Sequence, residues 1–274
     1  MKTKTLFPLL LASAVTAAHA EEYQSITDFD YSRTEIGSFK TDQYTLGSTY
    51  YFTPRMTMGP LKEFEYINRS SNVFGGYSYF DTDFDNVDSA IVGGEYFAGN
   101  LLVGGAYQNT EDQEAYYASV GYLASPDLLF RVDAEKFEDQ DTDYFASAQY
   151  NHRLGGSDYL GFTLRVDDDL DYRELSSKYF AEFGRGSYIA LSLNYASLDG
   201  DYVSVGGDDN TWSTKADYYF NKATSVGLGY DKDDNYLVDF SHFFQENIAL
   251  ELAYSSNADD SDLDTYTLGL RAQF

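Results

Sequence analysis

Nearly the whole sequence consists of segments about ten residues long in which apolar and polar side chains alternate. In residues 189–195, Ile, Leu and Tyr occupy the odd positions, and Ala, Ser and Asn occupy the even positions. The same pattern occurs in residues 128–135, 160–166 and 248–253. Successive side chains of a strand point to opposite faces of the sheet. This period of two therefore predicts strands with one apolar face and one polar, water-exposed face.

Two kinds of connection take turns between these segments. One kind is short and carries little charge, as in residues 99–100 and 155–157. The other kind is longer and rich in Asp and Glu, as in residues 138–143 and 199–210. Consecutive hairpins place alternate connections at opposite ends of a sheet, so all the acidic loops gather at one end. Short turns at one end and longer loops at the other are typical of barrels that span the outer membrane.

We therefore predict an all-β fold, a transmembrane antiparallel up-and-down β-barrel of about 16 strands with short periplasmic turns and acidic external loops. Closure pairs every strand with two neighbours, which lipid requires because it offers backbone groups no other partner. The predicted strands span residues 23–33, 43–52, 72–80, 89–98, 101–108, 115–124, 127–137, 144–153, 158–166, 174–184, 187–197, 211–220, 225–230, 235–244, 247–255 and 265–274.

One connection departs from this regular pattern. Residues 53–71 form a much longer link than the other turns at the same end. Its length is compatible with a further hairpin or with an insertion that acts as a plug.

A water-soluble β-sandwich is the main alternative fold. The chain has 27 Tyr and 20 Phe, and a sandwich would have to bury most of these rings between two sheets. In a membrane barrel, aromatic rings near strand ends instead lie at the headgroup level. The regular succession of hairpins also argues against the Greek-key connections of sandwiches. The predicted outward aromatic girdle comprises Tyr116, Tyr122, Tyr144, Tyr150, Tyr179, Phe183, Tyr218 and Phe220.

The first twenty residues resemble a secretory signal. Lys2 and Lys4 precede an apolar run from Leu6 to Ala17, and residues 18–20 read Ala-His-Ala, which fits a cleavage site with small residues. We predict a signal peptide over residues 1–20 and an outer-membrane barrel over residues 21–274.

Charge and composition exclude several classes of function. With 45 acidic and 18 basic residues, the formal net charge is −27, which disfavours binding to nucleic acid. The absence of Cys removes thiolate metal sites and thiol nucleophiles. His152 and His242 lie on different predicted strands without a metal-ligand spacing. We expect no enzymatic activity, no catalytic residues, no cofactor and no metal site.

The last ten residues carry the most specific pattern. Tyr266, Leu268, Leu270, Ala272 and Phe274 form one unbroken apolar face that ends on an aromatic residue. This face resembles the C-terminal assembly signal of bacterial outer-membrane barrels, which the barrel insertion machinery reads. The resemblance implies a location in the bacterial outer membrane and the barrel assembly machinery as a partner.

The sequence is also similar to a family. Residues 50–54 (Tyr-Tyr-Phe-Thr-Pro), followed by residues 58–64 and 68–73, resemble a segment of the general porins of Gram-negative bacteria. The resemblance implies passive diffusion of small hydrophilic solutes through a water-filled channel. General porins usually fold a long third external loop into the lumen, whereas the third external loop predicted here, residues 109–114, is too short to do so.

The polar face of the predicted strands supplies the candidate pore lining. Charges are tolerated on a water-filled lumen, whereas Arg or Lys facing lipid at the midplane costs about 2–4 kcal/mol. Five of these residues are basic and are expected to face the acids, as in porins that impose a transverse field on solutes. We predict that the pore is lined by Glu95, Arg131, Asp133, Glu135, Arg165, Lys178, Glu182, Lys215, Asp217, Asp239, Glu251 and Arg271.

The predicted function is therefore that of an outer-membrane porin for small hydrophilic solutes and ions. The acidic loops favour cation selectivity, because fixed negative charge raises the local concentration of cations. The alternative is a structural or adhesive barrel with a closed lumen, whose acidic external loops bind a partner. Further expected partners are outer-membrane lipid and lipopolysaccharide, and a homo-oligomer is left open.

Overall fold

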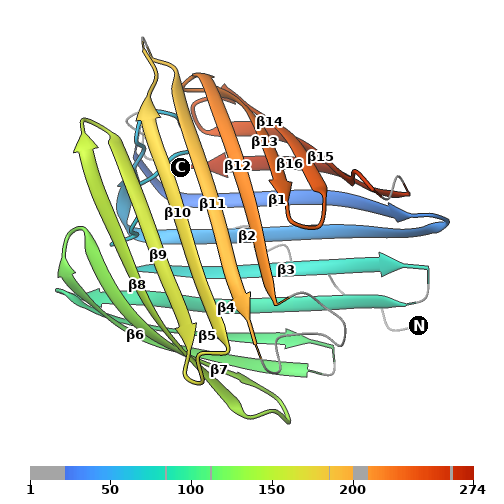
Figure 1. The fold of residues 1–274 in the computed structure, drawn as a ribbon, viewed down its shortest axis with the longest axis horizontal. Coiled ribbons are helices and arrows are strands. Elements are labelled where there is room, and N and C mark those ends of the chain that lie inside the picture. The colour runs from blue at the N-terminus through green and yellow to red at the C-terminus, as the bar shows by residue number, and fades with distance from the viewer. Residues whose placement is uncertain (1–21, 84, 112, 185, 200–208, 260–261) are drawn as a thin grey trace.

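Sixteen antiparallel strands form one closed barrel, in which strands adjacent in sequence pair and β1 closes against β16 (Figure 1). A computed structural model describes residues 22–274 except 84, 112, 185, 200–208 and 260–261. The strands are β1 (Glu22–Ile36), β2 (Phe39–Met56), β3 (Asn72–Thr82), β4 (Asn86–Ala98), β5 (Leu101–Thr110), β6 (Gln113–Ser125), β7 (Leu128–Phe137), β8 (Thr142–Gly155), β9 (Asp158–Asp167), β10 (Tyr172–Glu182), β11 (Tyr188–Leu198), β12 (Asn210–Asn221), β13 (Thr224–Asp231), β14 (Asn235–Gln245), β15 (Ile248–Asn257) and β16 (Leu263–Gln273).

The structure confirms the predicted strand number and the all-β barrel. The largest difference is the first hairpin, where β1 and β2 extend beyond the predicted 23–33 and 43–52. These extensions lack the alternation that marks a membrane face, but their backbones stay paired up to Ile36 and Phe39. In the part of the chain that the structure describes, no helix is long and apolar enough to cross a membrane. The predicted signal peptide lies outside the described residues.

The outer face of the barrel is apolar and exposed, as a lipid-facing surface must be. Seven of the eight residues predicted for the aromatic girdle are among its exposed large side chains. These seven are Tyr116, Tyr122, Tyr144, Tyr150, Phe183, Tyr218 and Phe220.

The C-terminal residues lie in the seam that closes the barrel. The Phe274 N–H donates to the Ser25 carbonyl oxygen at 2.8 Å, and the Ser25 N–H donates to the Phe274 carbonyl oxygen at 2.7 Å. Tyr266, Leu268 and Leu270 are exposed on the outer face. The terminal strand therefore presents the apolar face that the sequence predicts, while its recognition by an assembly machinery stays a prediction.

A closed ladder of this kind resists detergent until it is heated, because no free edge offers a starting point for unfolding. We expect β-rich circular dichroism in detergent and faster gel migration of the unheated protein than of the boiled protein. Extraction as a soluble monomer without detergent would contradict the barrel.

Candidate channel and plug segment

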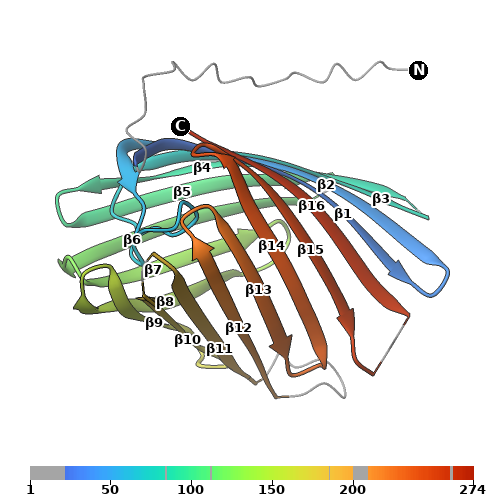
Figure 2. The same ribbon diagram turned by 90° about the horizontal axis from the view of Figure 1, so that it is seen from above.

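Residues 57–71, which join β2 to β3, turn into the barrel instead of crossing directly between the two strands. We call them the plug segment. In Figures 1 and 2 this light-blue stretch curls inward at the end of the barrel where the C terminus lies. The segment contains one isolated bridge, between Thr57 and Phe64, and no further strand. Of the two alternatives for the long link, the structure therefore shows the insertion and not the hairpin.

The tip of the plug segment is fixed to the wall formed by β12–β16. The Leu61 N–H donates to the carbonyl oxygen of Lys222 at 2.8 Å. The buried Gln273 side chain donates from Nε2 to the Leu61 carbonyl oxygen at 3.0 Å. The Leu61 side chain packs in a buried cluster with Phe243 and Ala249. Backbone and side chain thus both hold the tip against the wall.

A buried carboxylate fixes the next part of the segment. Glu63 is buried, and its Oε2 accepts a hydrogen bond from Lys178 Nζ at 2.6 Å. Its Oε1 accepts a hydrogen bond from the Tyr219 hydroxyl. A buried charge is tolerated only when it is paired and hydrogen-bonded. Glu63 therefore ties the plug segment to β10 and β12.

Aromatic packing fixes the segment to β9. The Tyr66 hydroxyl lies 2.7 Å from Thr163 Oγ1, and its ring centroid lies 5.9 Å from that of Tyr159. A Cβ atom at Gly161 would lie 2.5 Å from the Tyr66 ring, so only glycine allows this approach. Burial raises the pKa of the Tyr66 hydroxyl above its ordinary value.

The segment then reaches a third part of the wall. Ile67 is 2% exposed and packs in a buried cluster with Leu102, Leu123 and Leu129 of β5–β7. Its anchors thus run from β16 past β9 to β5. A chain segment with contacts so far apart around a barrel narrows the lumen.

The charged residues of the inner wall are arranged in compact clusters. Arg131 donates to Glu95 at 2.5 Å and to Asp133 at 2.6 Å. Arg165 donates to Glu135 at 2.6 Å, and its guanidinium lies 3.9 Å from the centroid of the Phe145 ring. The first cluster holds one more carboxylate than cationic groups, and the second is balanced.

A second triad with excess negative charge lies on β12–β14. Lys215 Nζ lies 2.8 Å from Asp217 Oδ1 and 2.8 Å from Asp239 Oδ2. One ammonium group is therefore shared by two carboxylates.

The seam between β1 and β16 carries a larger cluster that includes the plug segment. Arg271 donates to Asp28 at 2.7 Å. Lys62 of the plug segment lies 3.0 Å from Glu251 Oε1. Asp30 is level with Glu251, because both pair with Gly269 of β16. Three carboxylates thus surround two cationic groups.

Eleven of the twelve residues predicted to line the pore take part in these clusters or in the pair with Glu63. Glu182 is the exception: it is exposed at the end of β10 and accepts the Gly186 N–H at 3.2 Å. That the eleven act on permeating solutes stays a prediction.

The five basic residues predicted to face the acids are all paired. Each of them pairs with a carboxylate close to it on the wall or on the plug segment. A cation on the barrel wall is partly desolvated and loses some of its favourable hydration energy. A neighbouring carboxylate compensates for this loss, which favours pairing. That the set imposes a transverse field on solutes stays a prediction.

Sequence reasoning also missed several charged residues. Glu63 and Lys62 lie in the plug segment, outside the alternating strands, and Asp28 was not among the predicted wall residues. The only signal for the first two was the unusual length of the link between residues 53 and 71. The length of the link does not indicate which wall residues pair with the Glu63 carboxylate and the Lys62 ammonium group.

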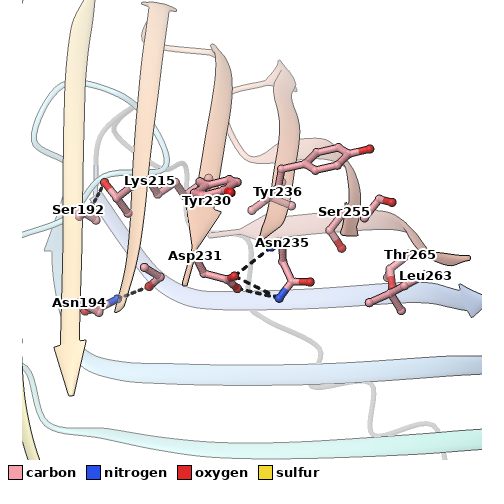
Figure 3. A pocket seen from close by; sticks show the side chains of 15 residues that line it. Ser192, Asn194, Lys215, Tyr230, Asp231, Asn235, Tyr236, Ser255, Leu263 and Thr265 are labelled. Atoms are coloured by element: carbon pink, nitrogen blue, oxygen red, sulfur yellow. Dashed lines mark hydrogen bonds between the residues drawn. The ribbon is translucent and has the colours of Figure 1, made fainter. Parts of the chain in front are cut away.

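Polar cavities lie along the inner wall. A cavity of about 610 Å³ is lined by hydroxyl, amide and charged side chains of β11–β16, which Figure 3 shows along neighbouring strands. Its residues include Ser192, Asn194, Asp231, Asn235 and Thr265. Within the described ranges, no three or more His, Cys, Asp or Glu side chains are placed to hold a metal ion. The wall therefore offers hydrogen bonds and charge to water and small polar solutes.

An apolar exterior, a polar interior and a closed strand ladder together define an outer-membrane β-barrel channel. The full chain, residues 1–274, matches the model of the family described as "Putative general bacterial porin", and the protein belongs to this family. It is a porin of the bacterial outer membrane. A comparison with curated proteins found no match.

Several solved structures have a similar fold. The outer membrane protein Omp33 of Acinetobacter baumannii is 17% identical, with a TM-score of 0.58 over 93% of this chain and 100% of that chain. CdiB from Acinetobacter baumannii is 9% identical, with a TM-score of 0.59 over 92% of this chain and 60% of that chain. The outer membrane protein OpdK from Pseudomonas aeruginosa is 10% identical, with a TM-score of 0.51 over 92% of this chain and 98% of that chain. At these identities the likeness concerns the fold.

Proposed function

We propose that this porin is a cation-selective channel for passive diffusion of ions and small hydrophilic solutes. The observation that carries the proposal is the excess of carboxylates in the inner-wall clusters. The Arg131 and Lys215 triads each place two carboxylates around one cation. A wall with net negative charge and little bulk water attracts cations and repels anions.

The external loops add to this effect. Asp83, Asp139, Asp168 and Asp259 lie in the connections β3–β4, β7–β8, β9–β10 and β15–β16. In an antiparallel barrel these connections are at the end opposite the β2–β3 connection, which holds the plug segment. Their field acts within a Debye length of about 10 Å at 0.1 M salt and fades at 1 M. Cations therefore enter from a mouth where they are already concentrated. The barrel assembly machinery and lipopolysaccharide remain proposed partners.

Reversal potentials in planar bilayers across a tenfold KCl gradient test the selectivity. We expect potassium to be preferred, more strongly at low salt than at high salt. Asp133→Asn and Asp239→Asn should each lower the permeability ratio of potassium to chloride, because each makes its triad neutral. Glu182→Gln is the matched control: it removes the same charge from the exposed end of β10, and we expect a much smaller change.

Two other outcomes would count against the proposal. A preference for chloride would show that the basic residues control the narrowest section. A complete lack of conductance by the wild-type protein would favour the structural or adhesive barrel with a closed lumen.

A further inference from the structure

The plug segment is packed unevenly around the lumen. Its buried contacts reach β5–β7, β9–β12 and β14–β16 through Leu61, Glu63, Tyr66 and Ile67, and Phe64 meets Tyr23 of β1 and Arg55 of β2. Toward β1–β4, a cavity of about 480 Å³ separates Lys62 of the segment from the wall. The segment thus obstructs one side of the lumen and leaves space on the other.

The wall on this open side carries glycines among bulkier residues at the level of the cavity. One row of paired residues runs from Arg271 through Asp28, Gly47 and Gly76 to Ile91. Directly paired residues point to the same face of a sheet, so Gly47 and Gly76 face the lumen with Asp28. The missing side chain of Gly47 widens the passage where the plug segment narrows it, whereas a Cβ atom at Gly76 would lie 3.2 Å from the Ile91 side chain.

The space beside Gly47 is open, whereas the obstructed side is filled. A Cβ atom built at Gly47 would meet nothing within 4 Å. At Gly161, on the obstructed side, a Cβ atom would lie 2.5 Å from the Tyr66 ring. Ala190 of β11, also on the obstructed side, is completely buried in the cluster that Tyr66 and Met58 cover.

We infer that ions and solutes pass the plug segment through a slot between Lys62 and the wall of β1–β4, with Gly47 setting its width. This inference rests on the proposed function. Asp28, Lys62 and Arg271 all line the same cavity, so a permeating solute meets charges of both signs there. Lys62 belongs to the plug segment and pairs with Glu251 on β15, so it forms the side of the slot opposite Gly47.

The natural chain has no cysteine, so single cysteines can report where the route lies. We would introduce Gly47→Cys and Ala190→Cys separately and treat each channel in a bilayer with a bulky methanethiosulfonate reagent. Gly47 does not adopt a positive φ angle, so its substitution leaves the strand backbone unstrained. We expect a severalfold fall in current for Gly47→Cys and no change for Ala190→Cys. Mass spectrometry on the detergent-solubilised variants gives the extent of labelling independently of current.

Each outcome decides between the two proposals. If the wild-type channel conducts and selects cations, but complete labelling of the Gly47→Cys variant leaves the current unchanged, the slot is wrong and the proposed function stands. A current block through Ala190→Cys would place the route on the other side of the plug segment and also overturn the slot. A wild-type protein without conductance overturns both. Gly47→Trp, which needs no reagent, should likewise reduce conductance severalfold.

Discussion

Replacing residues 53–70 by an Asn-Gly turn is expected to raise the single-channel conductance severalfold. The plug segment crosses part of the lumen, and conductance increases with the open cross-section of a channel. Sixteen-stranded barrels normally leave a wide aqueous channel, so we expect the plug segment and not the strand number to limit flow.

The junction for this deletion follows from the backbone pairing. The Phe52 N–H donates to the Ser71 carbonyl oxygen at 2.9 Å, so these residues already face each other across β2 and β3. A two-residue Asn-Gly connection forms a type I′ turn that suits such a hairpin. The ladder pairs between residues 41–51 and 72–82 remain. Heat-dependent gel migration of the deletion variant would show that its barrel is intact.

A single substitution tests the same obstruction with less disturbance. Glu63→Ala leaves Lys178 and Tyr219 without the buried carboxylate, and breaking a buried pair costs about 3–5 kcal/mol. We expect a larger open-state conductance or frequent transitions to such a state. Glu65→Ala is the matched control, because Glu65 forms a partly exposed pair with Arg69 that contributes about 0–1 kcal/mol.

Conductance equal to that of the wild type in both the deletion and the Glu63→Ala variants would contradict an obstructing role. In that case ions would already pass beside the plug segment in the wild-type channel, and the segment would not limit the conductance. The Glu65→Ala control distinguishes this outcome from a general loss of sensitivity in the bilayer assay.

Deleting Phe274 is expected to abolish assembly into the outer membrane. Phe274 closes the seam through main-chain hydrogen bonds to Ser25, and a carbonyl oxygen at this position also accepts the Gln24 N–H at 2.5 Å. Without Phe274, the backbone groups at the start of β1 lose their hydrogen-bond partners at the end of β16. An unpaired strand edge is unfavourable in lipid. We expect the chain to accumulate in the periplasm, with only a small fraction showing heat-dependent migration.

Two substitutions distinguish the role of the Phe274 backbone from that of its side chain. Phe274→Asp keeps the main-chain seam but places a charge on the terminal apolar face, and we expect it to block insertion almost as fully as the deletion. Phe274→Tyr keeps an aromatic ring and should assemble normally. Insertion of Phe274→Asp at the wild-type level, measured in outer-membrane fractions, would refute the assembly signal.

The sequence predicts the strands well because alternation is a local property. Residues 101–108 are predicted as a strand, and β5 spans Leu101–Thr110. A strand in lipid must put apolar side chains outward at every second position, so its identity is visible within about ten residues. Counting the hairpins along the sequence also gives the even number of strands. The same count places all the acidic loops at one end of the barrel.

The candidate site is only partly visible in the sequence. Parity places Arg131 and Asp133 on the polar face, and the structure shows them paired. Parity cannot show that Lys178 pairs with Glu63 instead of with a neighbouring strand, because 115 residues separate the two. The same holds for the other basic residues of the wall: alternation gives the face of a residue but not its partner.

The barrel, its strand number, its apolar exterior and its acidic loops can all be predicted from the amino-acid sequence, since each depends on residues close together in the chain. The course of residues 57–71, the charge clusters and the open space beside Gly47 are visible only in the folded barrel. These features depend on which strands come to lie opposite one another when the sheet closes. Closure is a property of the whole ladder, and no short segment of the sequence records it.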